Sequence, residues 1–389
     1  MGREIAYALI TPYSLLKSRT GGIIARLLSL SHLNLIGAQM LAPSDEMVDE
    51  YNAVLDESTV TDHMKKAFRG YINKNLRPEN DLHILNRCML LLLEGQSAVT
   101  VTRSIVGGIT KTPQGITIRG TYGDYIEYDD GNVHYFEPAV LIGPDKEITK
   151  KHLAVFARHS ERDGGILEQL VEDTPDSQTT LVILKPDNFL KASARTGNII
   201  DIFSRSGLYI VGAKVFSMAI EQAEEFYGPL KKIFNEKLKK NVAKRLQQRL
   251  ANAFDFEISE AEYSHMAESL KAKNAEREFC KIVEYMTGLP CPPAQTSAPA
   301  KEGGKCLALL YKGDAAIARI RDRLGATDPS KAKAGTVRSD YGSDLMRNAA
   351  HASDSAENAT RERKIIGLWE NPQTDCKASI ERYLEELSE

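Results

Sequence analysis

Residues 181–191 read LVILKPDNFLK, and this stretch decides the fold because an earlier part of the chain repeats it. It lies over Ala8–Lys17, and Pro186 matches Pro12. Two further pairs of blocks match in the same order, namely Thr196–Ile200 with Thr20–Ile24 and Leu208–Ala213 with Leu33–Ala38. Because several blocks recur in one order at a nearly constant offset, the sequence predicts a duplicated domain.

Each copy begins with an apolar strand that leaves into a turn at its proline. In the second copy we expect a helix over Gly197–Arg205, a strand over Leu208–Phe216 and further helices. A strand over Cys306–Tyr311 and a helix over Ala315–Leu324 follow. This order predicts an α+β sandwich of the split βαβ kind, an antiparallel sheet with helices on one face.

The polar, turn-forming stretch Glu172–Ser177 predicts the seam between the two copies. We therefore expect one domain over residues 1–172, a linker over 173–178 and a second domain over 179–389. The length of 389 residues also favours two domains over one.

The composition is that of a globular protein, with 42% hydrophobic and 26% charged residues. A formal net charge of -3 gives no global attraction to nucleic acid or membrane. No run approaches the roughly 18 apolar residues of a membrane-spanning helix, and Met1–Glu4 lacks a signal peptide's basic and apolar regions. The cysteines lack metal-ligand spacing and predict reduced thiols in a cytoplasmic protein; they are Cys88, Cys280, Cys291, Cys306 and Cys376.

The stretch with the most chemical content is Arg347–Ser355, which reads RNAAHASDS. Asp354 followed by Glu357 predicts a helix start, so His351 lies just before a helix N-terminus, where an anion is favoured. A neutral imidazole in this place could accept and hold a phosphoryl group. The alternative is an ordinary surface or capping histidine.

Several basic residues have the chemistry of a phosphate site. Lys185 ends an apolar strand beside a loop, and Arg321, Thr327 and Arg338 bracket a second loop that is rich in glycine and lysine. Guanidinium groups offer forked donors to phosphate oxygens. The alternative for each is a solvated basic side chain.

Three other residues are candidates for positioning a ligand or the histidine. Phe279 and Leu345 could sandwich a planar base, although apolar residues are more often part of a core. Glu362 lies about two turns into the helix after His351 and could orient the imidazole through its second nitrogen. The alternative for Glu362 is a solvated carboxylate.

Together these motifs resemble the nucleoside diphosphate kinase family over residues 179–389, apart from an insertion. The segments that carry the resemblance are LVILKPDNF, the region of Tyr227, Arg321-x3-Gly325-x-Thr327, Gly335–Asp340, RNAAHASDS and Ile366–Trp369. The resemblance implies two ferredoxin-like domains, each with a four-stranded antiparallel sheet, and a helical insertion in the second at about 229–275. It also implies ping-pong transfer of the γ-phosphate from a nucleoside triphosphate to a nucleoside diphosphate.

The family's site residues carry over by position. His351 matches the phosphorylated histidine, and Ser353 and Glu362 match the pair that supports it. The residues that match phosphate, sugar and nucleophile contacts are Lys185, Tyr227, Arg321, Thr327, Arg338 and Asn348. Phe279 matches the family's base-stacking phenylalanine.

The resemblance also implies the ligands and the assembly. Partners are nucleoside di- and triphosphates, with ATP as phosphoryl donor, and Mg²⁺ arrives with the nucleotide rather than on a protein metal site. Members of this family assemble through paired copies of the domain, so we expect the two copies to pair within the chain, with a homo-oligomer left open.

The first copy keeps the pattern but loses the chemistry. Thr11 stands where Lys185 stands, and the alignment of Ala139–Lys146 with Asn348–Ser355 places Ile142 over His351. Arg119 survives over Arg338. We therefore expect the first copy to be catalytically silent and structurally required.

The insertion is the remaining departure from the family. Residues 231–249 carry eight Lys and Arg against a single acid, Glu236, and the stretch over 289–304 reads as a flexible loop. We favour a solvated helix face over a nucleic-acid surface. Two alternative functions remain open: a nucleotide-binding regulatory or scaffold protein with weak turnover, and a nucleic-acid-associated protein that acts through the basic helix.

Overall fold

The computed structural model describes residues 3–80, 83–109, 115–128, 133–231, 234, 239–291 and 304–388. The chain divides into two compact units. The first comprises Met1–Phe216 and Cys306–Glu389 and holds both copies of the repeat, and the second, Ser217–Lys305, covers the predicted insertion. No helix among the residues just given is long and apolar enough to cross a membrane.

The first copy is built on one sheet with the strand order β6-β1-β3-β2-β7. Its strands are β1 Glu4–Ile10, β2 Asn34–Leu41, β3 Cys88–Gly95, β6 Val140–Leu141 and β7 Gly164–Gly165, and a separate hairpin pairs β4 Asp124–Glu127 with β5 Val133–Glu137. Its helices are α1 Pro12–Leu16, α2 Thr20–Ser29, α3 Asp45–Asp56, α4 Asp62–Asn75, α5 Ala98–Val106, α6 Ile118–Tyr122 and α7 Lys146–Asp163.

The second copy repeats this arrangement with the strand order β11-β8-β10-β9. Its strands are β8 Ser177–Leu184, β9 Tyr209–Ser217, β10 Lys305–Asp314 and β11 Ala350–Ala352. Its helices in the first unit are α8 Arg195–Ser204, α13 Ala316–Leu324, α14 Val337–Tyr341, α15 Ala356–Ile365 and α16 Asp375–Glu386, with short 3₁₀ turns at η2 Pro186–Asn188 and η3 Pro329–Lys331. Another 3₁₀ turn, η1 Glu168–Leu170, ends the first copy.

In both sheets a short strand from late in the copy, β6 or β11, lies beside the first strand, β1 or β8. The third strand, β3 or β10, separates the first strand from the second. The predicted fold class, an α+β protein with ferredoxin-like sandwiches, is therefore confirmed. The first sheet differs from the expected four strands only by the addition of the two-residue β7 at its edge.

Strand β1 shows why the first sheet is covered on both faces. All seven of its residues are buried. Because side chains alternate along a strand, Ile5, Tyr7 and Leu9 enter one apolar cluster and Ala8 and Ile10 enter another. The first cluster packs under α3, α4 and α7, and the second under α2.

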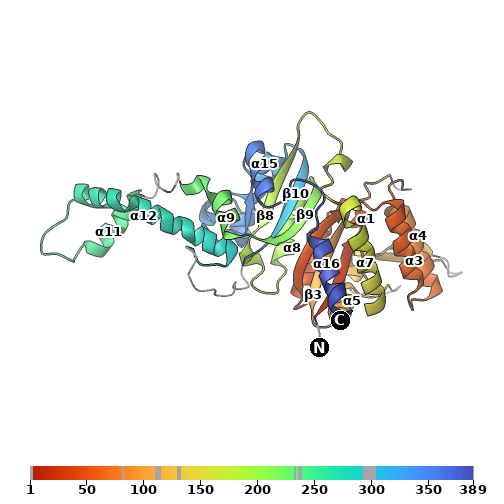
Figure 1. Ribbon diagram of the computed structural model, residues 1–389. Coiled ribbons are helices and arrows are strands. Elements are labelled where there is room, and N and C mark those ends of the chain that lie inside the picture. Colours follow the sequence, from red (N-terminus) through yellow and green to blue (C-terminus); the bar gives the residue numbers. More distant parts are fainter. Residues whose placement is uncertain are drawn as a thin grey trace. The chain divides into compact units, whose positions relative to one another are not determined.

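The C-terminal helix α16 packs on the first copy, although it follows the second copy in sequence. Its residues Cys376, Ile380 and Tyr383 are buried in the same cluster as Ile5 and Tyr7. In Figure 1 α16 lies beside the strands and α7 of the first copy. Helix α16 therefore covers part of the sheet face on which Ile5 and Tyr7 lie.

The two copies meet where α2 packs against α8. Gly21 and Gly197 occupy matching positions in the repeat, and each lies against the other's backbone. A Cβ atom built on Gly197 would lie 2.1 Å from the Gly21 carbonyl oxygen, and one on Gly21 would lie 2.5 Å from the Gly197 oxygen. Matching residues that contact each other define an interface with approximate twofold symmetry inside one chain.

The second unit is helical, with α9 Ile220–Tyr227, α11 Lys239–Leu250 and α12 Glu260–Thr287. Ser259 and Glu262 form a capping box that begins α12. Helices α11 and α12 pack together, and the Arg245 guanidinium lies 3.5 Å from the Glu278 carboxylate. Part of the basic run is thus neutralised within the unit, while Lys232 and Lys237, and the 292–303 part of the predicted loop, lie outside the described residues.

Candidate active site

His351 lies in β11, where it pairs with Ile183 of β8. Its Nε2 atom is 2.8 Å from Oε2 of Glu362, and the Ser353 hydroxyl donates to the same oxygen at 2.6 Å. Glu362 is reached because Ser355 caps α15 and the helix carries Glu362 back toward the strand. The structure therefore brings the three predicted residues His351, Glu362 and Ser353 into one hydrogen-bonded group.

The protonation of this group follows from its geometry. Burial raises the pKa of Glu362, but the electrostatic interaction with His351 and the hydrogen bonds from His351 and Ser353 outweigh it and hold the pKa below its usual value. A carboxylate only accepts hydrogen bonds, so the His351 proton lies on Nε2 and the ring's lone pair on Nδ1.

Lys185 immediately follows β8 and is 8% exposed. Its ammonium donates to Oδ1 of Asn348 at 2.7 Å and to the carbonyl oxygen of Met346 at 3.1 Å. Burial, helped by the charge of Arg338, lowers the pKa of Lys185 to about 8. The lysine is thus held against the segment that leads into β11.

Arg338 links the second predicted loop to the same strand. It donates to the carbonyl oxygens of Gly325 at 3.2 Å and Ala350 at 3.3 Å, and to the Thr327 hydroxyl at 3.4 Å. Asn348 Nδ2 donates to the Thr327 carbonyl at 3.0 Å. Lys185, Thr327, Arg338 and Asn348 therefore surround the start of β11, next to His351.

The other predicted residues are Arg321 and Leu345 in the first unit and Tyr227 and Phe279 in the second; the Leu345 carbonyl accepts from Asn348 Nδ2 at 3.1 Å. Arg321 is exposed in the last turn of α13, and Leu345 is 65% exposed. Tyr227 ends α9 and is buried, and Phe279 of α12 is 1% exposed with the Lys231 ammonium 4.2 Å from its ring centroid. Their roles toward a nucleotide stay predictions.

Sequence reasoning missed two residues that shape β11. Ala349 has a φ of 69°, a left-handed conformation that is costly for a residue with a Cβ. Its carbonyl oxygen accepts from the backbone N–H of Lys185 at 3.0 Å and from Nδ2 of Asn188 at 2.6 Å. Asn188 belongs to the KPDN segment that carries the resemblance, but its role depends on this long-range contact.

The first copy corrects one predicted equivalence. Ile10 pairs with Val140 and Leu9 with Leu141, just as Leu184 pairs with Ala350 and Ile183 with His351. Ala139 has a φ of 60°, which matches Ala349. Leu141, and not Ile142, therefore occupies the place of His351, so the predicted alignment was wrong by one residue.

The alignment of the two copies also shows which residue of the first copy stands in the place of Glu362. Counted from the helix caps Asp145 and Ser355, His152 stands in the place of Glu362. His152 is fully buried, stacks on the Tyr51 ring with centroids 3.8 Å apart, and has a pKa lowered by burial to about 3. The hydrogen-bonded group of His351, Ser353 and Glu362 in the second copy is thus replaced by aromatic core packing in the first.

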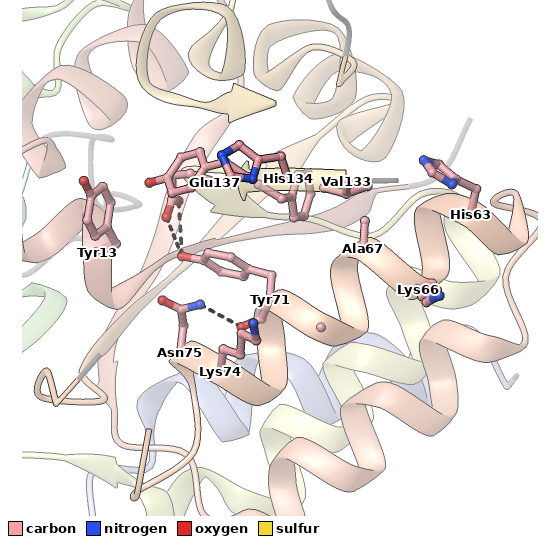
Figure 2. Close-up of a pocket in the computed structure, with 13 residues that line it drawn as sticks. Tyr13, His63, Lys66, Ala67, Tyr71, Lys74, Asn75, Val133, His134 and Glu137 are labelled. Atoms are coloured by element: carbon pink, nitrogen blue, oxygen red, sulfur yellow. Dashed lines mark hydrogen bonds between the residues drawn. The ribbon is translucent and has the colours of Figure 1, made fainter. Parts of the chain in front are cut away.

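The surroundings of Thr11 also differ from those of Lys185 in the second copy. The Thr11 and Tyr71 hydroxyls donate to the buried carboxyl of Glu137, at 3.4 Å and 2.9 Å. Figure 2 shows this carboxyl hydrogen-bonded to Tyr71. Both residues line a cavity of about 520 Å³, together with His63 and Lys66. Burial raises the pKa of Glu137 to about 7. An acidic group therefore lies beside the residue that replaced the cationic Lys185.

The side chains around His351 suit phosphate oxygens better than a metal ion. Lys185 and Arg338 are cationic donors, and the Oδ1 atom of Asn348 already accepts from Lys185. In the part of the chain that the structure describes, no three His, Cys, Asp or Glu side chains gather as a metal site.

The chain is similar in sequence to known nucleoside diphosphate kinases. The family model described as nucleoside diphosphate kinase matches residues 178–244 and 232–368, which lie in the second copy. A nucleoside diphosphate kinase of Campylobacter jejuni is 30% identical over 200 residues, which are 51% of this chain and 99% of the relative. One of Helicobacter pylori is 29% identical over 186 residues, 48% of this chain and 91% of the relative.

Two further similarities are more distant. The chloroplastic nucleoside diphosphate kinase II of Arabidopsis thaliana is 27% identical over 221 residues, 57% of this chain and 68% of that protein. The solved structure of an NDP kinase from Pyrobaculum aerophilum is 26% identical, covers 49% of this chain and 94% of its own, and has a TM-score of 0.35. On the family model and the Campylobacter jejuni relative, this chain belongs to the nucleoside diphosphate kinase family.

Proposed function

We propose that the second copy is an active nucleoside diphosphate kinase, with His351 as the phosphorylated residue. The observation that carries the proposal is the 2.8 Å contact between His351 Nε2 and the Glu362 carboxylate. This contact directs the lone pair to Nδ1, which makes that atom the nucleophile.

Transfer then takes two steps. The lone pair of Nδ1 attacks the γ-phosphorus of a nucleoside triphosphate, an N–P bond forms, and the bond to the β-phosphate oxygen breaks as the diphosphate leaves. The proton stays on Nε2, where the Glu362 carboxylate stabilises the positive ring. An oxygen of a second nucleoside diphosphate attacks the same phosphorus, the N–P bond breaks, and a new triphosphate leaves.

The cationic residues account for binding and charge stabilisation. Lys185 and Arg338 donate to phosphate oxygens as negative charge develops on them, and Asn348 holds Lys185 in place. Arg321 and Thr327 extend the same phosphate contact, and the exposed Leu345 contacts the nucleoside. Magnesium that enters bound to the nucleotide would neutralise further phosphate charge.

We also propose that the first copy is silent and supplies an internal pairing partner. Leu141 offers no nucleophile, and Thr11 offers no cation. The pairing is supported by the direct backbone approach of Gly21 and Gly197. Residues 1–172 and 179–389 then act as one paired assembly joined by the linker.

The test is phosphoryl transfer from ATP to GDP in the presence of magnesium, followed with the full chain. His351→Ala is expected to reduce turnover by at least about a thousandfold, since the nucleophile is lost. His134→Ala is the matched control, because His134 is an exposed residue of the first copy, and it should retain full turnover. Equal turnover of the two variants would contradict the proposal.

A further inference from the structure

The first copy contains a second cavity, of about 410 Å³, between α3, α4, α5 and the residues around β6. Leu55, Val60 and Phe68 form part of an apolar wall, and Leu141 lies where His351 lies in the second copy. Two arginines, Arg103 and Arg119, also line it. A volume above about 300 Å³ is typical of small-molecule sites.

These arginines match the two arginines of the second copy. Arg119 donates to the carbonyl oxygens of Gly107 at 3.0 Å and Val140 at 3.2 Å, which repeats the contacts of Arg338 with Gly325 and Ala350. The carbonyl oxygen of Arg103 accepts from the Gly107 N–H that ends α5, as that of Arg321 does at the end of α13. The sequence comparison found only the match of Arg119.

Their charge is not balanced inside the cavity. The Nε atom of Arg119 is buried and has no hydrogen-bond partner among the described residues. Burial, helped by the charge of Arg103, lowers the pKa of Arg119 to about 10. The Arg119 guanidinium also lies 5.5 Å from the centroid of the Phe68 ring. A desolvated guanidinium such as that of Arg119, with the exposed Arg103 nearby, is stabilised when an anion enters the cavity.

We propose that this cavity binds a nucleoside diphosphate without transferring its phosphate. Phosphate oxygens meet Arg119 at the back and the exposed Arg103 at the mouth, and the planar base meets Phe68, Leu55 and Val60. No transfer follows, because Leu141 replaces the nucleophile. The inference rests on the proposed function only for the role of the matching arginines in the second copy.

The test is equilibrium dialysis of the full chain with ADP. The unaltered chain is expected to bind two ADP per chain, and Lys185→Ala, which weakens the second-copy site, should leave one tight site. Arg103→Glu is expected to weaken the first-copy site by roughly tenfold to a hundredfold, since it replaces a charge-assisted donor by a repelling carboxylate. Lys66→Glu is the charge-matched control, because this exposed lysine lines the other cavity, and it should still bind two ADP.

Three results would overturn the inference: a stoichiometry of one that Lys185→Ala abolishes, two sites that Arg103→Glu leaves unchanged, or pyrophosphate competing at the first-copy site as well as ADP does. The last would show that the nucleoside is not recognised. Turnover from ATP to GDP, measured on the same preparations, separates this inference from the proposed function. Loss of the first-copy site should leave turnover intact, whereas absence of turnover in the unaltered chain contradicts the proposed function alone.

Discussion

Replacing Gly197 by alanine tests the pairing of the two copies. The new Cβ atom would lie 2.1 Å from the Gly21 oxygen and 2.3 Å from the Ala25 nitrogen, and both are backbone atoms that no side-chain rotation can move. The helices α2 and α8 must therefore separate, which loosens the packing of Ile199 and Ile200, both fully buried. Overpacking of a core costs about 1–3 kcal/mol, and contact with backbone places this variant at about 3 kcal/mol.

The gain in helix propensity offsets part of this cost. Alanine is better than glycine inside a helix by about 1 kcal/mol, so the net loss for Gly197→Ala is about 2 kcal/mol. Gly70→Ala is the matched control, because Gly70 lies within α4 and a Cβ there meets nothing within 4 Å. The control is expected to gain about 1 kcal/mol.

The two variants should differ by about 3 kcal/mol in the free energy of unfolding. With a denaturant slope of about 3 kcal/mol/M, the urea midpoint of Gly197→Ala falls about 1 M below that of Gly70→Ala. Far-ultraviolet circular dichroism measures both midpoints under identical conditions. Equal midpoints would refute the claim that the copies depend on this contact.

Four further predictions concern Lys185, the C-terminal helix and the first copy. The pKa of Lys185 is about 8, so its charge is lost as pH rises through 8; the KM for nucleotide should rise there, and in Lys185→Gln it should not. Because the folded pKa lies below the usual value near 10.5, the folded state holds fewer protons than the unfolded state between these values, and the apo-protein's stability should rise with pH across that window. Ending the chain at Thr374 removes α16 and uncovers the apolar face that Cys376, Ile380 and Tyr383 cover, so the melting temperature should fall and light scattering increase, at a cost of roughly 5 kcal/mol. Leu141→His should yield no second phosphohistidine by mass spectrometry, because the neighbouring Thr11 is not a cation.

The fold class followed from sequence because the repeat preserved local patterns. Apolar strands that turn at Pro12 and Pro186, and a glycine at matching positions of the next helix, are local signals, and they recur in order. The hydrogen-bonded group of His351, Ser353 and Glu362 was also predictable, since these residues lie in one strand, the residue after it and the helix that follows. Such short separations leave few arrangements open.

Contacts between residues far apart in the sequence were not predictable in the same way. Leu141 and Ile142 are both apolar, so only the pairing of β6 with β1 decides which of them replaces His351. The amphipathic pattern of α16 predicts one buried face but not the copy that covers it. Arg103 was not predicted from the sequence because no motif surrounds it. Its match to Arg321 is visible only in the structure, where each arginine carbonyl accepts from the glycine N–H that ends its helix.

Phosphorylation of His351 is the measurement that tests the central claim most directly. The full chain is incubated with magnesium and ATP labelled in the γ-phosphate, without any acceptor, and the protein is isolated and digested. We expect one label per chain, on the peptide that contains His351, stable in alkali, labile in acid and released as labelled triphosphate when any nucleoside diphosphate is added. A label on another residue, or a His351→Ala chain that labels as well as the unaltered one, would contradict the account.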